Sequence, residues 1–274
     1  VTRAGALGIL DGDQIRSILS LYHLDDLEDF GDVTRSRTHA AYWVRVRGRR
    51  YVLRISEKKR MADMLREKEL LLHLRSEGLP VPELIQNVAR GTFIPWASAG
   101  RFVSLFHDMP GREIGLFEVR ARHARAVADF AARLHVACAR FALPCDDAHR
   151  APSLDPSLGR LRRALRVPCL GRRLGDDLAW LERESARQRL RDVDALPAGM
   201  IHGDLAIENV RFDRERLACV SDCGASHRER FTWEIACLVN AWCWVPLAEQ
   251  TGGPAGTFKR QRVRSLLCAY ETVR

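Results

Sequence analysis

The chain has 274 residues, of which 46% are hydrophobic and 29% are charged. This length and apolar content suit one large domain or two smaller ones, and they exclude a chain that is disordered as a whole. The formal net charge of +9 rests on 44 basic residues, only four of which are lysines. Because the arginines are scattered and form no basic tail or aromatic-interleaved stripe, we interpret them as solvated surface and expect no nucleic-acid partner.

No apolar run approaches the length of a membrane-spanning segment, so we expect no membrane partner. The eight cysteines form no Cys-x-x-Cys pair, and several lie in apolar runs. This pattern favours buried, reduced thiols over a zinc site, and it favours the cytoplasm as the compartment. The chain starts at Val1 and stops inside a helix-like segment, which leaves open whether either end is complete. We expect a monomer or a homodimer.

Periodicity predicts a first half that is rich in strands. A short helix within residues 9–24 is followed by a polar connection, and alternating apolar residues predict a β-hairpin over 40–56. Further strands are expected at 83–87 and 101–106. Between them, residues 60–77 form a helix whose expected core side consists of Met61, Met64, Leu65, Leu71, Leu72 and Leu74.

From residue 115 onward the pattern becomes helical. Apolar residues at spacings of three and four predict a long amphipathic helix around 127–138, and more helices follow within 154–192. A second hairpin over 209–220 and a helix over 231–244 complete the pattern. We therefore predict an α+β fold with two lobes. Residues 1–108 form a small antiparallel β lobe that binds nucleotide, and residues 109–274 form a larger, mainly helical lobe for catalysis and substrate.

Three oxygen-bearing side chains stand at a spacing that points to chemistry. Asp204 and Asn209 lie five residues apart in one loop, and Asp222 follows at the end of the second hairpin. Phosphoryl transfer needs one carboxylate to accept the proton of the attacking hydroxyl, and further oxygen ligands to hold Mg²⁺ on the nucleotide phosphates. The protein-kinase catalytic loop uses the same order and spacing. This set therefore predicts a phosphotransferase site.

The stretch HGDLAIENV, followed by a hairpin and Asp222, is similar to the aminoglycoside phosphotransferase/choline kinase family, whose members share the protein-kinase-like two-lobed fold. Within that family, EIACLVNAWCW, YVLRISEK and EGLPVPELI resemble segments of the type II homoserine kinases. The resemblance spans roughly residues 33–245. It implies an ATP- and Mg²⁺-dependent kinase that transfers the γ-phosphoryl group to a hydroxyl of a small molecule, with homoserine, an intermediate of threonine biosynthesis, as the best single substrate.

The resemblance also implies roles for individual residues. Asp204 is expected to be the catalytic base, and Asn209 and Asp222 are expected to bind Mg²⁺. Arg54 of the third strand and Glu67 of the helix are expected to belong to the nucleotide site, where Arg54 should contact phosphate and Glu67 should pair with Arg54. For the nucleotide, the resemblance implies phosphate contacts from hydroxyls and an adenine-binding hinge over residues 104–107, which together involve Ser36, Thr38, Ser104 and Phe106. Substrate contacts are expected from His202, which also braces the loop, and from Glu234, Asn240 and Trp242.

Several positions depart from the pattern that the resemblance implies. Arg54 stands where the family has a lysine, and the phosphate loop at 34–39 contains no glycine. Glu234 replaces an aspartate, and Ala241 removes a carboxylate near the expected acceptor pocket. Two alternatives therefore stay open. The chain is either a related phosphotransferase for another amino-alcohol, a choline-like compound or an aminoglycoside, or a catalytically weak pseudokinase that only binds nucleotide.

Overall fold

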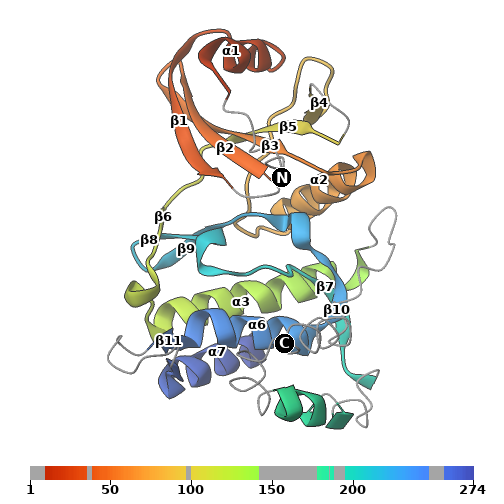
Figure 1. Ribbon diagram of the computed structural model, residues 1–274, viewed down its shortest axis with the longest axis vertical. Helices are drawn as coiled ribbons and strands as arrows, with labels where there is room; N and C mark the ends of the chain where they lie inside the picture. The colour runs from red at the N-terminus through yellow and green to blue at the C-terminus, as the bar shows by residue number, and fades with distance from the viewer. Residues whose placement is uncertain are drawn as a thin grey trace, which may run out of the picture.

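Figure 1 shows the computed structural model, in which the β-rich N-terminal part lies above a mainly helical C-terminal part. The structure describes residues 10–35, 39–96, 100–141, 178–184, 186–187, 195–246 and 256–274. Within these residues the predicted order, a β lobe and then a helical lobe, is confirmed. The exact division of the chain at residues 108 and 109 stays a prediction.

The upper lobe is built on one antiparallel sheet with the strand order β1-β2-β3-β5-β4. Its strands are β1 (Leu27–Arg35), β2 (His39–Val46), β3 (Arg49–Ser56), β4 (Phe93–Pro95) and β5 (Phe102–His107).

The hairpin predicted over 40–56 is confirmed as β2 and β3, which are joined by Arg47 and Gly48. Both residues have a positive φ, of 50° and 70°, as a tight two-residue hairpin turn requires. Two other predictions are wrong. The expected polar connection contains β1, and the strand expected over 83–87 contributes only a single bridge between Leu84 and Phe106.

The two helices of this lobe cover opposite faces of the sheet. Alternate residues of β2, such as Tyr42 and Val44, pack in a cluster with the apolar side of α1 (Gly12–Ser20), whereas Ala41 belongs to the cluster that includes α2 (Met61–Ser76). Successive side chains of a strand point to opposite faces, so a single sheet serves two separate cores.

The predicted core side of α2 is only partly right. Met64, Leu71 and Leu74 are buried, but the other three predicted core residues are 47%, 41% and 46% exposed: Met61, Leu65 and Leu72. In their place the helix buries Glu67 and Leu70. A buried glutamate interrupts the apolar stripe, so apolar periodicity alone assigns the wrong side to part of this helix.

The lower lobe places the helices α3, α6 and α7 beneath the strands β8 and β9 (Figure 1). The long helix, the second hairpin and the helix over 231–244 are confirmed as α3, β8–β9 and α6. The elements of this lobe are β6 (Arg112–Glu113), α3 (Ala121–Ala137), β7 (Ala198–Ile201), β8 (Val210–Asp213), β9 (Arg216–Val220), β10 (His227–Arg230), α6 (Phe231–Cys243), β11 (Trp244–Pro246), β12 (Gly256–Phe258) and α7 (Arg260–Val273). Of the helices predicted within 154–192, only residues 178–184 and 186–187 are described, and these are helical.

Six of the eight cysteines lie in the described residues, and all six are free thiols; Cys145 and Cys169 lie outside them. Burial raises the pKa of Cys138 and of Cys219 to about 12, so both thiols are held in the neutral, unreactive form. Across the described ranges, none of the helices combines the length and the apolar character needed to cross a membrane.

Candidate active site

A cavity of about 500 Å³ lies between the two lobes, and both lobes contribute to its walls. One part is apolar, because Ala41, Val52, Phe106 and Met109 line it. The other part carries ionisable and amide groups from β3, α2 and the loops around β8 and β9, namely Arg54, Glu67, Asp204, Asn209 and Asp222. A cavity that combines apolar and charged lining residues suits a ligand with a flat aromatic group and a charged tail.

The three residues singled out by their spacing come together in this cavity. Asn209 donates from Nδ2 to both the carbonyl oxygen and the Oδ2 atom of Asp204, each at 2.9 Å. This leaves the Oδ1 atom of Asn209 available as an acceptor or a metal ligand. Asp222 has a left-handed backbone, with φ of 63° and ψ of 48°. Such a conformation is rare outside glycine and is concentrated at functional sites.

His202 holds the loop that carries Asp204. Its imidazole is buried, accepts at Nδ1 from the amide of Asp204 (3.3 Å) and donates from Nε2 to the carbonyl of Ser221 (3.1 Å). Burial lowers the pKa of His202, in keeping with this neutral form. The imidazole thus links the Asp204 loop to the segment just before Asp222. This geometry fits the bracing role implied by the sequence, and the burial of His202 argues against direct contact with a substrate.

Glu234 accepts hydrogen bonds from the backbone of the loop that carries Asp204. Its Oε1 accepts from the amide of Gly203 (2.9 Å), and its Oε2 accepts from the amide of His202 (3.2 Å) and contacts Nε2 of His135 at 2.8 Å. Burial raises the pKa of Glu234, but His135 and these amides outweigh it and hold the pKa below its usual range. Gly203 has a φ of 81°, and a Cβ there would lie 2.7 Å from the carbonyl oxygen of Ala225, so this turn requires glycine.

Two of the residues that were expected to contact the substrate are buried in this structure. Glu234 and Trp242 are 1% and 0% exposed and lie behind the loop, where their polar atoms bond its backbone. Trp242 donates from Nε1 to the carbonyl of Leu205 at 2.8 Å. Asn240 is exposed on α6, and its contact with a substrate stays a prediction.

The predicted pair between α2 and β3 is present. Nη1 and Nη2 of Arg54 each lie 2.8 Å from one carboxylate oxygen of Glu67, in a bidentate ion pair whose side chains are only 13% and 6% exposed. The guanidinium also lies over the ring of Phe106, 5.0 Å from its centroid. Arg54 therefore ties α2 to the sheet, in the pair that the resemblance implies for the cation of the third strand.

The hinge predicted over residues 104–107 lies within β5, and its contact with adenine stays a prediction. Ser104 and Phe106 are buried inside β5, and their register pairs with β3 uses the backbone within the sheet. The amide of His107 donates to the carbonyl of Glu83 (3.0 Å). Residues 104–107 are thus occupied by sheet contacts, and the connection between the lobes begins after them; Met109 in this connection lines the cavity. Ser36 and Thr38 lie outside the described residues.

The sequence of the chain matches a known family of enzymes. Residues 33–266 match the model of the phosphotransferase enzyme family, APH. The chain belongs to this family. It is 26% identical over 269 residues to a homoserine kinase of Methylobacillus flagellatus, covering 96% of this chain and 76% of that one. Family membership makes the protein a phosphotransferase acting on hydroxyl groups, with the protein-kinase-like fold.

Solved structures of this phosphotransferase fold give the same result. A microcompartment-associated aminopropanol kinase superimposes with a TM-score of 0.70 at 18% identity, covering 96% of this chain and 81% of that one. An amicoumacin kinase in complex with AMP-PNP, Ca²⁺ and Ami has a TM-score of 0.69 at 14% identity, with 97% and 78% covered. At these identities the likeness shows the fold alone.

The cavity of this phosphotransferase also contains side chains that sequence reasoning missed: His39, Glu113, Glu208 and Arg211. Arg211 donates from Nε (3.1 Å) and Nη2 (2.6 Å) to the carbonyl of Gly111 and so anchors the connection between the lobes. Alternation in β8 could have identified it, because Val210 and Phe212 are buried on the opposite face. Glu208 lies inside the HGDLAIENV stretch and His39 ends the expected phosphate loop, but neither was assigned a role, and Glu113 belongs to no motif that was recognised.

Proposed function

We propose that the protein is an ATP-dependent homoserine kinase. The observation that carries this proposal is the convergence of Asp204, Asn209 and Asp222 in one cavity. Relatives named homoserine kinase support the choice of acceptor. The apolar wall formed by Val52, Phe106 and Met109 suits an adenine ring, and this orientation directs the phosphates toward Arg54 and Asp222.

The donor set fits Mg²⁺. Asn209 and Asp222 both offer hard oxygen atoms to the cavity, and the Oδ1 atom of Asn209 is not used by its contacts with Asp204. Among the described residues, no group of three or more His, Cys, Asp and Glu side chains is arranged to hold a metal. A two-residue site suits Mg²⁺, which takes its other ligands from phosphates and water. Bound there, Mg²⁺ supplies neutralisation of the charge on the transferring phosphoryl group.

Asp204 acts on the acceptor. Its carboxylate is exposed to the cavity and is held by the amide of Asn209, so one oxygen atom has a fixed direction while the other remains available for a hydroxyl proton. The hydroxyl of the substrate then attacks the γ-phosphorus in line with the departing ADP. The buried contacts of His202 and Glu234 keep the loop in place during this step.

Homoserine carries an ammonium and a carboxylate besides its hydroxyl, and the cavity has a complement for each. Glu113 and Glu208 line it with carboxylates that suit the ammonium, and Arg211 suits the carboxylate. Glu113 and Glu208 would supply the acidic group that the family resemblance implies at position 241, where this chain has alanine. The free thiols of the described chain motivate a further part of the proposal, that the enzyme acts in the cytoplasm.

The test is an acceptor screen with ATP and Mg²⁺. Homoserine, choline, ethanolamine, methylthioribose and an aminoglycoside are compared by ADP release, and the product is identified by phosphorus NMR. We expect O-phosphohomoserine to form fastest. A faster reaction with another acceptor would replace homoserine as the substrate. Binding of ATP without turnover of any acceptor would favour a nucleotide-binding pseudokinase.

A further inference from the structure

A chain of hydrogen bonds connects helix α7, which packs against α3 and α6, to the loop of Asp204 (Figure 1). The hydroxyl of Tyr270, on α7, lies 2.8 Å from Nδ1 of His135, on α3. Nε2 of the same imidazole lies 2.8 Å from Oε2 of Glu234, on α6. Because Glu234 accepts from the two amides just before Asp204, three helices contribute one side chain each to a polar path that ends beside Asp204.

The members of this path are buried. Tyr270, His135 and Glu234 are 7%, 2% and 1% exposed. The ring of Phe231 stacks on the imidazole of His135, with 4.1 Å between the ring centroids. Because a buried polar group without a partner is destabilising, these side chains favour the single arrangement that keeps every bond.

The direction of each hydrogen bond follows from the donors available. Burial raises the pKa of Glu234, but its hydrogen bonds outweigh this effect, so the carboxylate stays ionised and can only accept. The proton of the imidazole of His135 therefore lies on Nε2, and in the neutral ring Nδ1 accepts from the hydroxyl of Tyr270. The oxygen atom of that hydroxyl accepts in turn from Nη1 of Arg274 at 3.2 Å. Every bond along the path thus points toward Glu234.

The path acts on the placement of Asp204. A shift of Glu234 would move both amides that it accepts from, and with them the carboxylate of Asp204 in the cavity. Misplacing a catalytic group by about 1 Å can cost about 10²-fold in rate. Neither His135 nor Tyr270 lines the active-site cavity, so any effect they have on the reaction passes through Glu234.

We propose that His135 and Tyr270 are positioning residues for the loop of Asp204, so that helix α7 takes part in placing the catalytic carboxylate. His135 orients Glu234 toward the loop amides, and Tyr270 holds the imidazole in the tautomer that donates to Glu234. The assignment rests on the proposed function, in which Asp204 accepts the proton of the attacking hydroxyl. It gives a role to α7, although none of the residues of this helix lines the cavity.

The experiment compares Tyr270→Phe with Tyr22→Phe, which makes the same change at a buried tyrosine of the upper lobe. Tyr22 is 3% exposed, and its hydroxyl donates to the carbonyl of Val103 at 3.3 Å. Hydrogen exchange at the amides of His202 and Gly203 is followed by NMR without nucleotide or acceptor, and thermal unfolding checks that both variants fold. A lost hydrogen bond predicts exchange about 3- to 10-fold faster in Tyr270→Phe and unchanged exchange in Tyr22→Phe.

Steady-state kinetics with the best acceptor of the screen separate the placement of the loop from the binding of nucleotide. Tyr270→Phe should lower kcat about 3- to 10-fold and leave the KM for ATP within about twofold of wild type, because the path ends at the loop. His135→Leu removes both bonds of the imidazole and should lower kcat further. His135→Gln keeps a nitrogen donor for Glu234 and should regain part of kcat.

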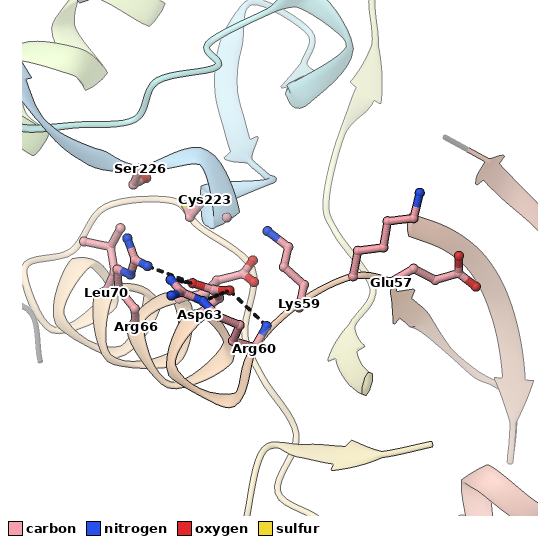
Figure 2. Close-up of a pocket in the computed structure, with 11 residues that line it drawn as sticks. Glu57, Lys59, Arg60, Asp63, Arg66, Leu70, Cys223 and Ser226 are labelled. Atoms are coloured by element: carbon pink, nitrogen blue, oxygen red, sulfur yellow. Dashed lines mark hydrogen bonds and ion pairs between the residues drawn. The ribbon is translucent and has the colours of Figure 1, made fainter. Parts of the chain in front are cut away.

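A second control tests whether the loss of any polar contact near the cavity loosens the loop. Figure 2 shows Asp63 of α2 engaged by Arg60 and Arg66, at 3.0 and 2.8 Å, beside a separate cavity of about 520 Å³. Asp63→Asn removes the negative charge from these pairs. It should leave exchange at the loop amides unchanged, because the pairs lie at the start of α2 in the other lobe.

Three results would overturn the assignment. They are exchange at the wild-type rate in Tyr270→Phe, an equal rise in exchange in either control, and an unchanged kcat in a variant whose loop amides exchange faster. Since exchange needs no acceptor, its outcome is independent of the acceptor screen. A chain that phosphorylates none of the acceptors can still show the effect of Tyr270 on the loop, and a homoserine kinase can still lack it.

Discussion

The two sides of the cavity are held together in different ways. On the C-terminal side, the loop of Asp204 rests on buried neutral and charged groups that bond its backbone, with Glu234 at the centre. On the N-terminal side, an ion pair between Arg54 and Glu67 joins the helix α2 to the sheet. The first side keeps the residues that the family resemblance implies for catalysis. On the second side, an arginine forms the pair for which the resemblance implies a lysine.

The largest effect is expected from Asp204→Asn, which tests the catalytic half of this contrast. The new amide keeps an oxygen atom to accept from Asn209, but it cannot accept a proton from a hydroxyl, so kcat should fall about 10²- to 10⁴-fold. Affinity for ATP should not change. Steady-state ADP release measures kcat, and calorimetry measures the affinity for ATP. Asp213→Asn, at an exposed position of β8, makes the same chemical change and serves as the control. Turnover close to wild type would remove Asp204 from the mechanism.

Glu234→Ala tests the structural support of the same side. The change leaves the amides of His202 and Gly203 without their acceptor in a buried place, and it removes the partner of His135. Unpaired buried donors cost about 1–3 kcal/mol each, so we expect a loss of about 2–5 kcal/mol in the free energy of unfolding. Urea denaturation measures it. Glu215→Ala, which breaks an exposed ion pair, should cost less than about 0.5 kcal/mol, and equal losses in the two variants would contradict the comparison.

The pH dependence of stability follows from the neutral histidines. Burial lowers the pKa of His202, and the same holds for His39 and His123. As the pH falls below about 6.5, the unfolded chain takes up protons that the folded chain refuses, so stability decreases toward acid. Each histidine contributes at most about 1.4 kcal/mol per pH unit.

Urea denaturation between about pH 7 and pH 5 measures this slope, which should be smaller in His202→Gln. A stability that stays constant over this range in the wild-type chain would show that these histidines protonate equally well when folded. The lowered pKa of Glu234 adds a further loss at more acidic pH, below the ordinary range of a glutamate, because its carboxylate must then be protonated.

Local patterns predicted much of the fold. The hairpin of β2 and β3 was predictable because its alternation and its Arg47-Gly48 turn lie within a few residues of each other. The strand β1 was missed because it is an edge strand of the sheet with charged residues in its sequence, LEDFGDVTR, so its pairing with β2 depends on tertiary context. The same applies to α2, whose buried Glu67 is explained only by Arg54 on another element.

In the candidate site too, residues joined by short loops were predictable, whereas contacts between distant elements were not. Asp204, Asn209 and Asp222 were found because the loop and the hairpin that bring them together are short. The functions of Glu234 and Trp242 were not found, because bonds from α6 to the loop join residues about thirty positions apart, and sequence spacing does not predict such contacts.

The smallest effect is expected from Arg54→Lys, which restores the residue that the family resemblance implies. Lysine keeps the charge but offers a single nitrogen where the guanidinium offers two, so part of the bond to Glu67 is lost. We expect a loss of about 1 kcal/mol, seen as a fall of about 2–4 °C in the midpoint of thermal unfolding. The KM for ATP should change by less than about tenfold, because lysine keeps the positive charge at this position. A larger change at an unchanged midpoint would show that the nucleotide needs the second terminal nitrogen of the guanidinium.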